Sequence, residues 1–562
     1  MTTQGILPRP AIAPDPGPLD ERFYDLVETR FVRLVRDSPV LGTVLGLHDH
    51  DDLLGNGSRD AILGNLAAER EHLACVEAFD TAGLSADVRF ERDLEVHNLQ
   101  RVIFDLDVLR LWERRSLALD TIGDGLFLLF ARDHAPLAER LSAISGRLEA
   151  VATYLEEART RATVPQVRRW QRLELESAAE MPLFLDELAA AGHGVLPATE
   201  LRRLERASEA AKIAIELYGS WLEETLSGGT DDWAIGRERH DALVALRAFD
   251  GLDADAILEL GWEQLRDEKA ARVAAAGEID PAMDEAAAVD LVKSDHPATF
   301  EEALDAYRDA MGRARRHVVE HAIATVPDDE RIDVIETPEY LRNVLPFAAY
   351  FEPAAFDPGP KGIYVVTPSV DGDPNAMREH NFASISNTSI HEAYPGHHLQ
   401  LDAARRHPSL TRMLADAPEF VEGWAMYSEL MMREQGFDTG PRSRLAMHTD
   451  AIWRACRIIL DVRMQRGEMT VEQATDFLVE QTGFERPNAR AEVLWYTYRP
   501  TYPLSYLLGR TLLFALRADE QRRLGDRFNL KGFHDTLLRN GSLPVSFQRR
   551  LLQGEGEPAA GG

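Results

Sequence analysis

The chain has 562 residues, 45% of them hydrophobic, and a formal net charge of −32 at pH 7. This length and composition suffice to bury a large core, and the negative charge argues against binding to nucleic acid or to an anionic lipid surface, because both need a basic patch. The two cysteines, Cys75 and Cys456, are far apart in apolar stretches, so we expect neither a disulfide framework nor a cysteine-based zinc site.

The two ends of the chain differ from its body. Residues 1–18 are rich in proline and lack the basic start and apolar core of a signal peptide, so we expect an extended or disordered arm. No segment has the roughly 20 apolar residues of a membrane span, and this predicts a cytoplasmic protein. Residues 19–552 are expected to form a single helical body, with a helical N-terminal part (19–327) and a second part (328–552), followed by a disordered tail at 553–562.

Helical periodicity runs from about Leu19 to Leu226, where apolar residues recur at three- and four-residue spacing among the strong helix formers Ala, Leu, Arg and Glu. Residues 227–236 have the composition of a loop, and Ala254–Ala276 is predicted as a further long helix. Another helix is predicted after Thr299, whose hydroxyl suits an N-cap.

The composition changes between Asp328 and Asn387, where Pro, Gly and β-branched residues are frequent. Residues 332–338 and 362–368 are predicted as short strands, since both are apolar runs bounded by breakers. Helix is expected to return at about Ile390 and to continue to Leu552. The predicted fold class is therefore mainly α, a large helical body with a small β-sheet near its middle.

The residue types of a metal site are concentrated just after these strands. His391 and Glu392 are adjacent, His397 and His398 follow closely, and Glu422 comes about 25 residues later. Imidazole and carboxylate are the usual ligands of catalytic zinc, which takes three of them and keeps one position open. A carboxylate beside a ligand histidine can accept the proton of the attacking water, as in the HExxH motif.

The spacing of these histidines does not fit a regular helix. Six or seven residues of helix rise about 9 or 10.5 Å, too far for two imidazoles to meet one zinc ion at about 2.0 Å. The chain must therefore bulge between them, and Pro395-Gly396 is where it can, because proline disrupts the helix and glycine tolerates unusual dihedrals.

Glu422 is the expected third ligand. It follows His397 by 25 residues and His398 by 24, and helical zincins place a glutamate ligand at this separation, so spacing alone leaves the second histidine open. We favour His397, because a Gly-His step precedes that ligand in related zincins and its bulge is smaller; His398 is the alternative. Glu429 lies on the same helical face as Glu422 and is a candidate to orient a ligand histidine.

The strings HEAYPGHHLQ (391–400) and EGWAMYSE (422–429) closely resemble a large bacterial domain-of-unknown-function family regarded as candidate α-helical, zincin-like zinc metallopeptidases. The resemblance is strongest from Pro338 to Gly509. It implies an all-helical zincin-like body with a deep cleft. The chain departs from relatives at Gln465, where they often have histidine, and at Leu494-Trp495, where they often have two arginines.

A zinc hydrolase gains from a donor aimed at the developing oxyanion. The aromatic stretch 494–506 offers several tyrosines, of which Tyr506 is the first choice, because it lies in the family-like segment, and Tyr496 the second. The competing interpretation is that these aromatic side chains pack the core. The histidines outside the motif, among them His48, His50, His240, His380 and His448, are expected to be structural.

The leading hypothesis is a hydrolase with one Zn²⁺ per chain that cleaves amide bonds of short peptides, with Glu392 as general base. A second hypothesis is hydrolysis of a specialised small-molecule amide or ester, suggested by Gln465 and Leu494-Trp495. A third is a non-catalytic binding protein that retains the fold, and two histidines with one carboxylate also resemble a non-haem iron site. The sequence leaves the substrate, the direction of cleavage and the oligomeric state open.

Overall fold

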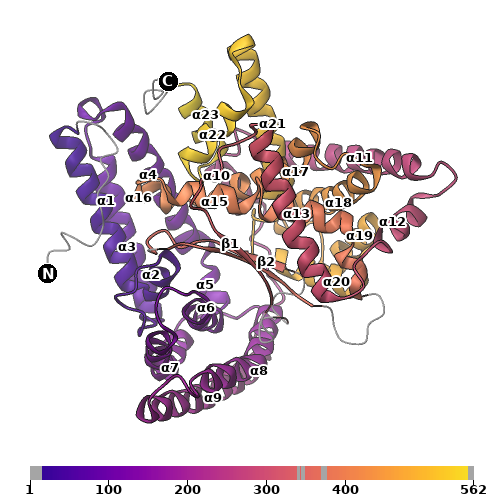
Figure 1. The fold of residues 1–562 in the computed structure, drawn as a ribbon. Coiled ribbons are helices and arrows are strands. Elements are labelled where there is room, and N and C mark those ends of the chain that lie inside the picture. The colour runs from indigo at the N-terminus through magenta and orange to yellow at the C-terminus, as the bar shows by residue number, and fades with distance from the viewer. Residues whose placement is uncertain (1–15, 338–341, 343–347, 358, 369–375, 555–562) are drawn as a thin grey trace.

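The computed structural model describes residues 16–337, 342, 348–357, 359–368 and 376–554. Predictions for residues 1–15 and for the tail from 555 onward lie outside these ranges. The described chain is mainly α-helical with one small sheet, as predicted (Figure 1). None of the described helices is long and apolar enough to span a membrane.

The helices before the sheet match the predicted periodicity, and Thr299 caps α13 through a bond from the Glu302 amide to its hydroxyl. These helices are α1 (Pro18–Asp37), α2 (Pro39–Leu45), α3 (Arg59–Glu77), α4 (Ala86–Phe104), α5 (Leu111–Arg114), α6 (Ala118–Ala131), α7 (Leu137–Arg159), α8 (Arg168–Ala191), α9 (Ala198–Leu226), α10 (Arg237–Arg247), α11 (Ala254–Ile279), α12 (Glu285–Lys293) and α13 (Phe300–Glu320).

The helices after the sheet begin earlier than predicted, with α14 at Phe382, because the Asn381 side chain caps it by accepting from the Ser384 amide. These helices are α14 (Phe382–Glu392), α15 (His397–Arg405), α16 (Leu410–Met413), α17 (Pro418–Glu434), α18 (Pro441–Gln465), α19 (Val471–Thr482), α20 (Arg486–Tyr496), α21 (Ser505–Leu524), α22 (Leu530–Asn540) and α23 (Val545–Leu552). Short helical turns of other types are η1 (Thr81–Gly83), η2 (Asp105–Leu109), η4 (Ala376–His380) and η5 (Gly525–Arg527).

The sheet has the strand order β1-β3-β2, with bounds Ile332–Glu336, Gly362–Val366 and Ala348–Phe351. β3 pairs in parallel with β1 and antiparallel with β2. Because β3 is central, all five of its residues are buried, which explains its continuous apolar run. The two predicted strands are β1 and β3; β2 was not predicted, since its sequence AAYF is too short to show a periodicity.

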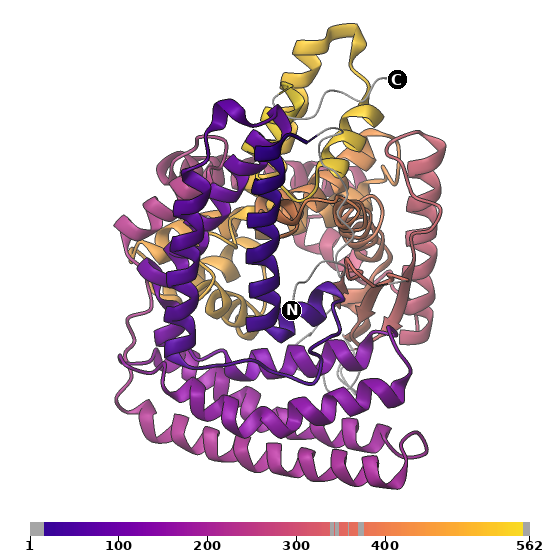
Figure 2. The ribbon, with the colours of Figure 1, turned by 90° about the vertical axis from the view of Figure 1, so that its left-hand side faces the viewer.

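Two hydrophobic cores organise the molecule. The larger is built around the fully buried Phe420, Trp424 and Tyr427 of α17 and extends over α11, α13, α18 and α21. The smaller fills the space between α6, α7, α8 and α9. Figure 1 shows these early helices at the left and bottom and the later helices at the upper right, and Figure 2 shows α7, α8 and α9 as long helices below the rest.

Helices α17 and α21 approach each other at a pair of glycines. A Cβ atom on Gly509 would lie 1.9 Å from the carbonyl oxygen of Glu419, and one on Gly423 would lie 2.5 Å from the backbone of Gly509. Only glycine therefore fits at either position. This contact brings the start of α21, with Tyr506, and the preceding Tyr502 beside Glu422 of α17.

Candidate metal centre

Three predicted ligands converge in the larger core. His391 lies near the end of α14, His397 begins α15 and Glu422 lies in α17; all three are buried, and one possible ligand atom from each lies within 4.8 Å of the others. Glu422 Oε2 is 3.3 Å from His397 Nε2 and 3.9 Å from His391 Nε2. The two imidazole rings are perpendicular, with centroids 4.8 Å apart.

The bulge expected at Pro395-Gly396 is present between α14 and α15. The Gly396 amide donates to the Ile390 carbonyl at 3.0 Å, so the chain folds back over the last turn of α14. A Cβ atom on Gly396 would lie 1.8 Å from the His391 carbonyl oxygen. Glycine is therefore required by this close approach, and the return of the chain is what brings His397 back to His391.

A side chain of α17 also stabilises the turn at Pro395-Gly396. The indole Nε1 of Trp424 donates to the Pro395 carbonyl at 2.7 Å. Trp424 lies two residues after Glu422 and is fully buried. The helix that carries the glutamate thus also fixes the turn that carries the second histidine.

Glu429 contacts the first histidine from the opposite side. His391 Nδ1 donates to Glu429 Oε1 at 2.7 Å, and Asn387 Nδ2 donates to the other carboxylate oxygen at 3.1 Å. Burial acts to raise the pKa of the Glu429 carboxyl, but the hydrogen bond and charge of His391, with the charges of Arg454 and Arg433, together outweigh it, so the pKa is lowered. This contact fixes the ring so that Nε2 faces Glu422.

The charges of the cluster reinforce one another. Burial acts to raise the pKa of Glu422, but the hydrogen bond and charge of His397 lower it to about 2. Burial acts to lower the pKa of His397, but Glu422 and, to a smaller extent, Glu392 raise it above its ordinary value. Glu392 is half-buried at the last residue of α14, close enough to His397 for its charge to act there. The group is therefore rich in negative charge.

His398 points away from the cluster. Its Nε2 lies 2.8 Å from Glu330 Oε2 and its Nδ1 lies 2.9 Å from the hydroxyl of Tyr350 on β2. Glu330 also accepts from the Tyr394 hydroxyl at 2.6 Å and from Arg315 Nε at 2.8 Å. Of the two histidines that spacing left open, His397 lies with the other ligand candidates and His398 ties the turn to the sheet.

Tyr496, Tyr502 and Tyr506 have different surroundings in the structure. The Tyr502 hydroxyl donates to Glu422 Oε1 at 2.9 Å, whereas Tyr502 had not been selected. Tyr506 lies beside it, with ring centroids 6.1 Å apart; burial and the charge of Glu422 raise its pKa. Tyr496 is buried and donates to Glu492 at 2.8 Å. No sequence signal distinguished Tyr502, because it lies among four similar polar aromatic or basic side chains.

The departures from the family pattern have mostly structural roles. Gln465 is fully buried, and its Nε2 donates to the Tyr496 carbonyl at 2.7 Å, so it supports the backbone after α20. Trp495 packs its ring against Tyr502 with centroids 5.5 Å apart. Trp495 is thus the departure that lies next to the ligand cluster.

Comparisons with known proteins define the family and the fold. The model of a family described as "Bacterial protein of unknown function (DUF885)" matches residues 39–552. A structure from Shewanella oneidensis, titled a "putative lipoprotein of unknown function", has a TM-score of 0.77 at 23% identity and covers 94% of this chain and 99% of its own. A second such lipoprotein structure, from Colwellia psychrerythraea, has a TM-score of 0.82 at 17% identity and covers 95% of this chain and 98% of its own. No curated protein matches the sequence.

The two structures contradict the prediction of a cytoplasmic protein. Both are described as a "putative lipoprotein", and lipoproteins are held at membranes by an attached lipid. The prediction relied on the composition of residues 1–18 and on the lack of an apolar span. Neither observation reports where a protein resides, and we withdraw the prediction.

Proposed function

The chain belongs to DUF885, a bacterial family of unknown function, and we propose that it is a zinc-dependent hydrolase that cleaves amide bonds, with short peptides as substrates. One observation carries this proposal: a carboxylate, Glu392, directly follows the first histidine of a buried cluster of two imidazoles and one glutamate. Such a cluster with an adjacent base is the arrangement of hydrolytic zinc sites.

The donor set fits zinc. Ligands at about 2.0–2.1 Å from a tetrahedral zinc ion are about 3.3 Å from one another, and the two separations from Glu422 Oε2 are 3.3 and 3.9 Å. His391 Nδ1 is engaged by Glu429, which leaves Nε2 for the metal. His391, His397 and Glu422 would hold the ion, and a fourth position would remain open.

A zinc ion bound there supplies a Lewis acid and lowers the pKa of a bound water to about 7. Glu392 would accept the proton of the attacking water on its carboxylate and pass it to the leaving amine. The Tyr506 hydroxyl, beside Tyr502 and Glu422, would donate to the oxyanion. Tyr502, through its bond to Glu422 Oε1, would keep the other oxygen of that carboxylate turned toward the histidines.

A small amide or ester substrate is the second candidate. Trp495 lies against Tyr502 next to the cluster, at a position where the family resemblance implies arginine. An aromatic ring in place of a cation favours an apolar group over a carboxylate at that place. Substrate libraries should therefore contain acyl amides and esters beside peptides.

The test compares wild type with Glu392→Gln, and uses Glu434→Gln as the matched control, because Glu434 lies on α17 but pairs with Arg517 at the surface. We expect wild type and both variants to bind zinc at the His391 cluster with the same stoichiometry. Glu392→Gln should lose at least about 10²-fold in kcat, the usual contribution of a general base, and Glu434→Gln should be unchanged. Full activity in Glu392→Gln would contradict the role of Glu392. A metal analysis that finds iron instead of zinc would contradict the proposed identity of the metal.

A further inference from the structure

A second group of metal-ligating side chains lies outside the proposed active site. His48 and Asp51 are in the connection between α2 and α3, and His134 is in the connection between α6 and α7. One possible ligand atom from each lies within 4.8 Å of the others. The histidines outside the motif, His48 among them, were expected to be structural, because they lie in connections that are distant in sequence.

The imidazoles of His48 and His134 both approach one oxygen of the Asp51 carboxylate. Asp51 Oδ2 lies 2.7 Å from His48 Nδ1 and 3.5 Å from His134 Nε2. The two imidazoles are stacked, with centroids 3.7 Å apart and an interplanar angle of 4°. Two imidazole nitrogens thus approach the same side of a single carboxylate.

Contacts to Oδ1, the other oxygen of Asp51, orient the carboxylate. The Thr43 hydroxyl donates to Asp51 Oδ1 at 2.6 Å, and Arg147 Nη2 lies 3.8 Å from the same atom. These contacts occupy Oδ1 and leave Oδ2 facing the imidazoles. Asp51 and His134 are both largely buried, whereas the His48 side chain is 27% exposed.

A second carboxylate fixes the first histidine from outside. His48 Nε2 lies 2.8 Å from Asp357 Oδ1, in the connection between β2 and β3. This repeats the arrangement at the other cluster, where His391 Nδ1 lies 2.7 Å from Glu429 Oε1. In each case a histidine directs one nitrogen at the ligand carboxylate and the other at an outer carboxylate, the pattern that orients metal-bound histidines.

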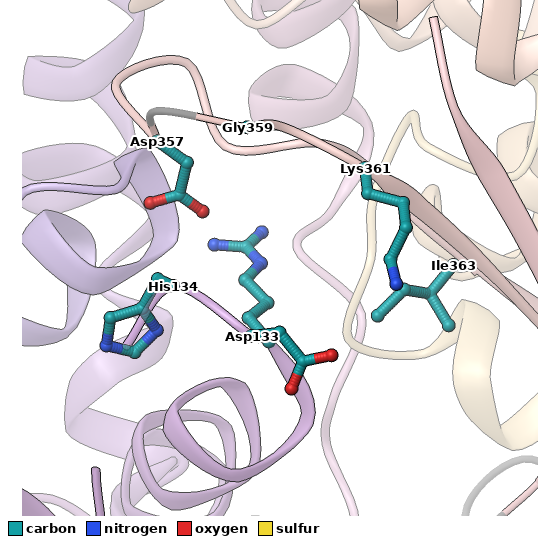
Figure 3. A pocket seen from close by; sticks show the side chains of 7 residues that line it. Asp133, His134, Asp357, Gly359, Lys361 and Ile363 are labelled. Atoms are coloured by element: carbon teal, nitrogen blue, oxygen red, sulfur yellow. The ribbon is translucent and has the colours of Figure 1, made fainter. Parts of the chain in front are cut away.

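A pocket opens beside the group. Its volume is about 300 Å³, and its lining includes Arg132, His134, Asp357 and Lys361. Figure 3 shows His134 and Asp357 on one side of this pocket and Lys361 on the other. The pocket provides a path by which an ion can enter and space for water on its open side.

We propose that His48, Asp51 and His134 bind a divalent transition-metal ion such as zinc, with Asp357 orienting His48. Imidazole and carboxylate ligands suit this class of ion. The Asp51–His134 separation already matches the about 3.3 Å between tetrahedral zinc ligands, and the Asp51–His48 pair must open by roughly half an ångström. The ion would connect the α2–α3 and α6–α7 segments to the β2–β3 connection through Asp357. The alternative to metal binding is that Asp51 and the two imidazoles share a proton.

The experiment measures zinc in a background that lacks the first cluster. The tag-free double variant His391→Ala/His397→Ala is stripped with a chelator, dialysed against Zn²⁺ and analysed for metal, with and without His134→Ala. His50→Ala is the matched control, because it is two residues from His48 but outside the group. We expect one zinc per chain in the background and in the His50 variant, and none after His134→Ala.

A second readout covers the case in which His134→Ala does not fold. Zn²⁺ should raise the Tm of the background variant itself, since binding to the folded state alone stabilises it. Co²⁺ in place of Zn²⁺ should give the weak visible absorption of a site with nitrogen and oxygen ligands. A background variant that binds no zinc, or that binds it equally well without His134, would overturn the proposal and leave a proton-linked ion pair at this place.

Discussion

Removing the charge of Glu429 should weaken zinc binding at the His391 cluster while the fold is retained. Glu429 is 2% exposed and accepts from His391 Nδ1 at 2.7 Å. Glutamine has nearly the same shape, so Glu429→Gln keeps an accepting oxygen and loses only the charge. Hydrogen bonds to charged groups contribute about 1.5–3 kcal/mol and neutral ones about 0.5–1.5 kcal/mol. The difference, about 1–2 kcal/mol, corresponds to roughly a 5- to 30-fold loss of affinity.

The assay is competition for Zn²⁺ with a chromophoric chelator, using wild type, Glu429→Gln and the control Glu434→Gln on the same helix. The control should match wild type, because Glu434 pairs with Arg517 at the surface. A circular dichroism melt checks that each variant is folded. Wild-type zinc affinity in Glu429→Gln would refute the reasoning, since it would mean that His391 does not bind the metal or does not depend on its outer carboxylate.

Three further variants test other parts of the structure. Gly396→Ala should abolish zinc binding at the His391 cluster and destabilise the fold by roughly 3 kcal/mol or more, because the new Cβ would lie 1.8 Å from the His391 carbonyl oxygen; metal analysis and denaturant melts measure both effects. Tyr502→Phe removes the bond to Glu422 and should lower kcat about tenfold with zinc still bound. Glu174→Gln should raise the free energy of unfolding at pH 8 by at most about 3 kcal/mol and change it little at pH 4.5, because burial raises the pKa of that carboxyl to about 7.

The sign of the last effect follows from proton binding. Between pH 4.5 and about 7 the folded state keeps the proton of Glu174 and the unfolded state releases it, so wild-type stability falls as pH rises through this window. Glutamine cannot ionise, so the stability of Glu174→Gln does not fall for this reason. A stability gain that is equal at pH 4.5 and pH 8 would contradict the assignment. Intact zinc binding at the His391 cluster in Gly396→Ala, or unchanged kcat in Tyr502→Phe, would contradict the other two predictions.

Much of the fold follows from local sequence signals. The loop at 227–236, the cap at Thr299 and the two apolar strands were predictable, because each depends on residues adjacent in the chain. β2 was not, since its four residues become a strand only by pairing with β3. The same limit applies to the turn at Gly396. The spacing of the histidines showed that a bulge was needed there, but not which hydrogen bonds form it.

In the candidate sites, too, some features follow from local sequence and others depend on tertiary packing. The convergence of His391, His397 and Glu422 could be predicted because two of them lie in one short motif and the third follows at a familiar separation. The contact of Tyr502 with Glu422 depends on how closely two helices pack at a glycine pair, which no local pattern encodes. The group around His48 combines segments more than 80 residues apart, so the histidines had no reason to be associated.

The contacts that stabilise the turn at Pro395-Gly396 bear on whether the fold depends on a bound metal ion. The turn is fixed by the Gly396 amide, by the Trp424 indole and, through His398, by Glu330, all of them protein groups. Its geometry therefore does not require an ion, in contrast to zinc fingers, which are unfolded without metal. If the proposed function holds, folding and loading would be separate events: the folded apoprotein could be filled, emptied and refilled without unfolding, and supply and donor chemistry would decide the identity of the ion at the moment of filling.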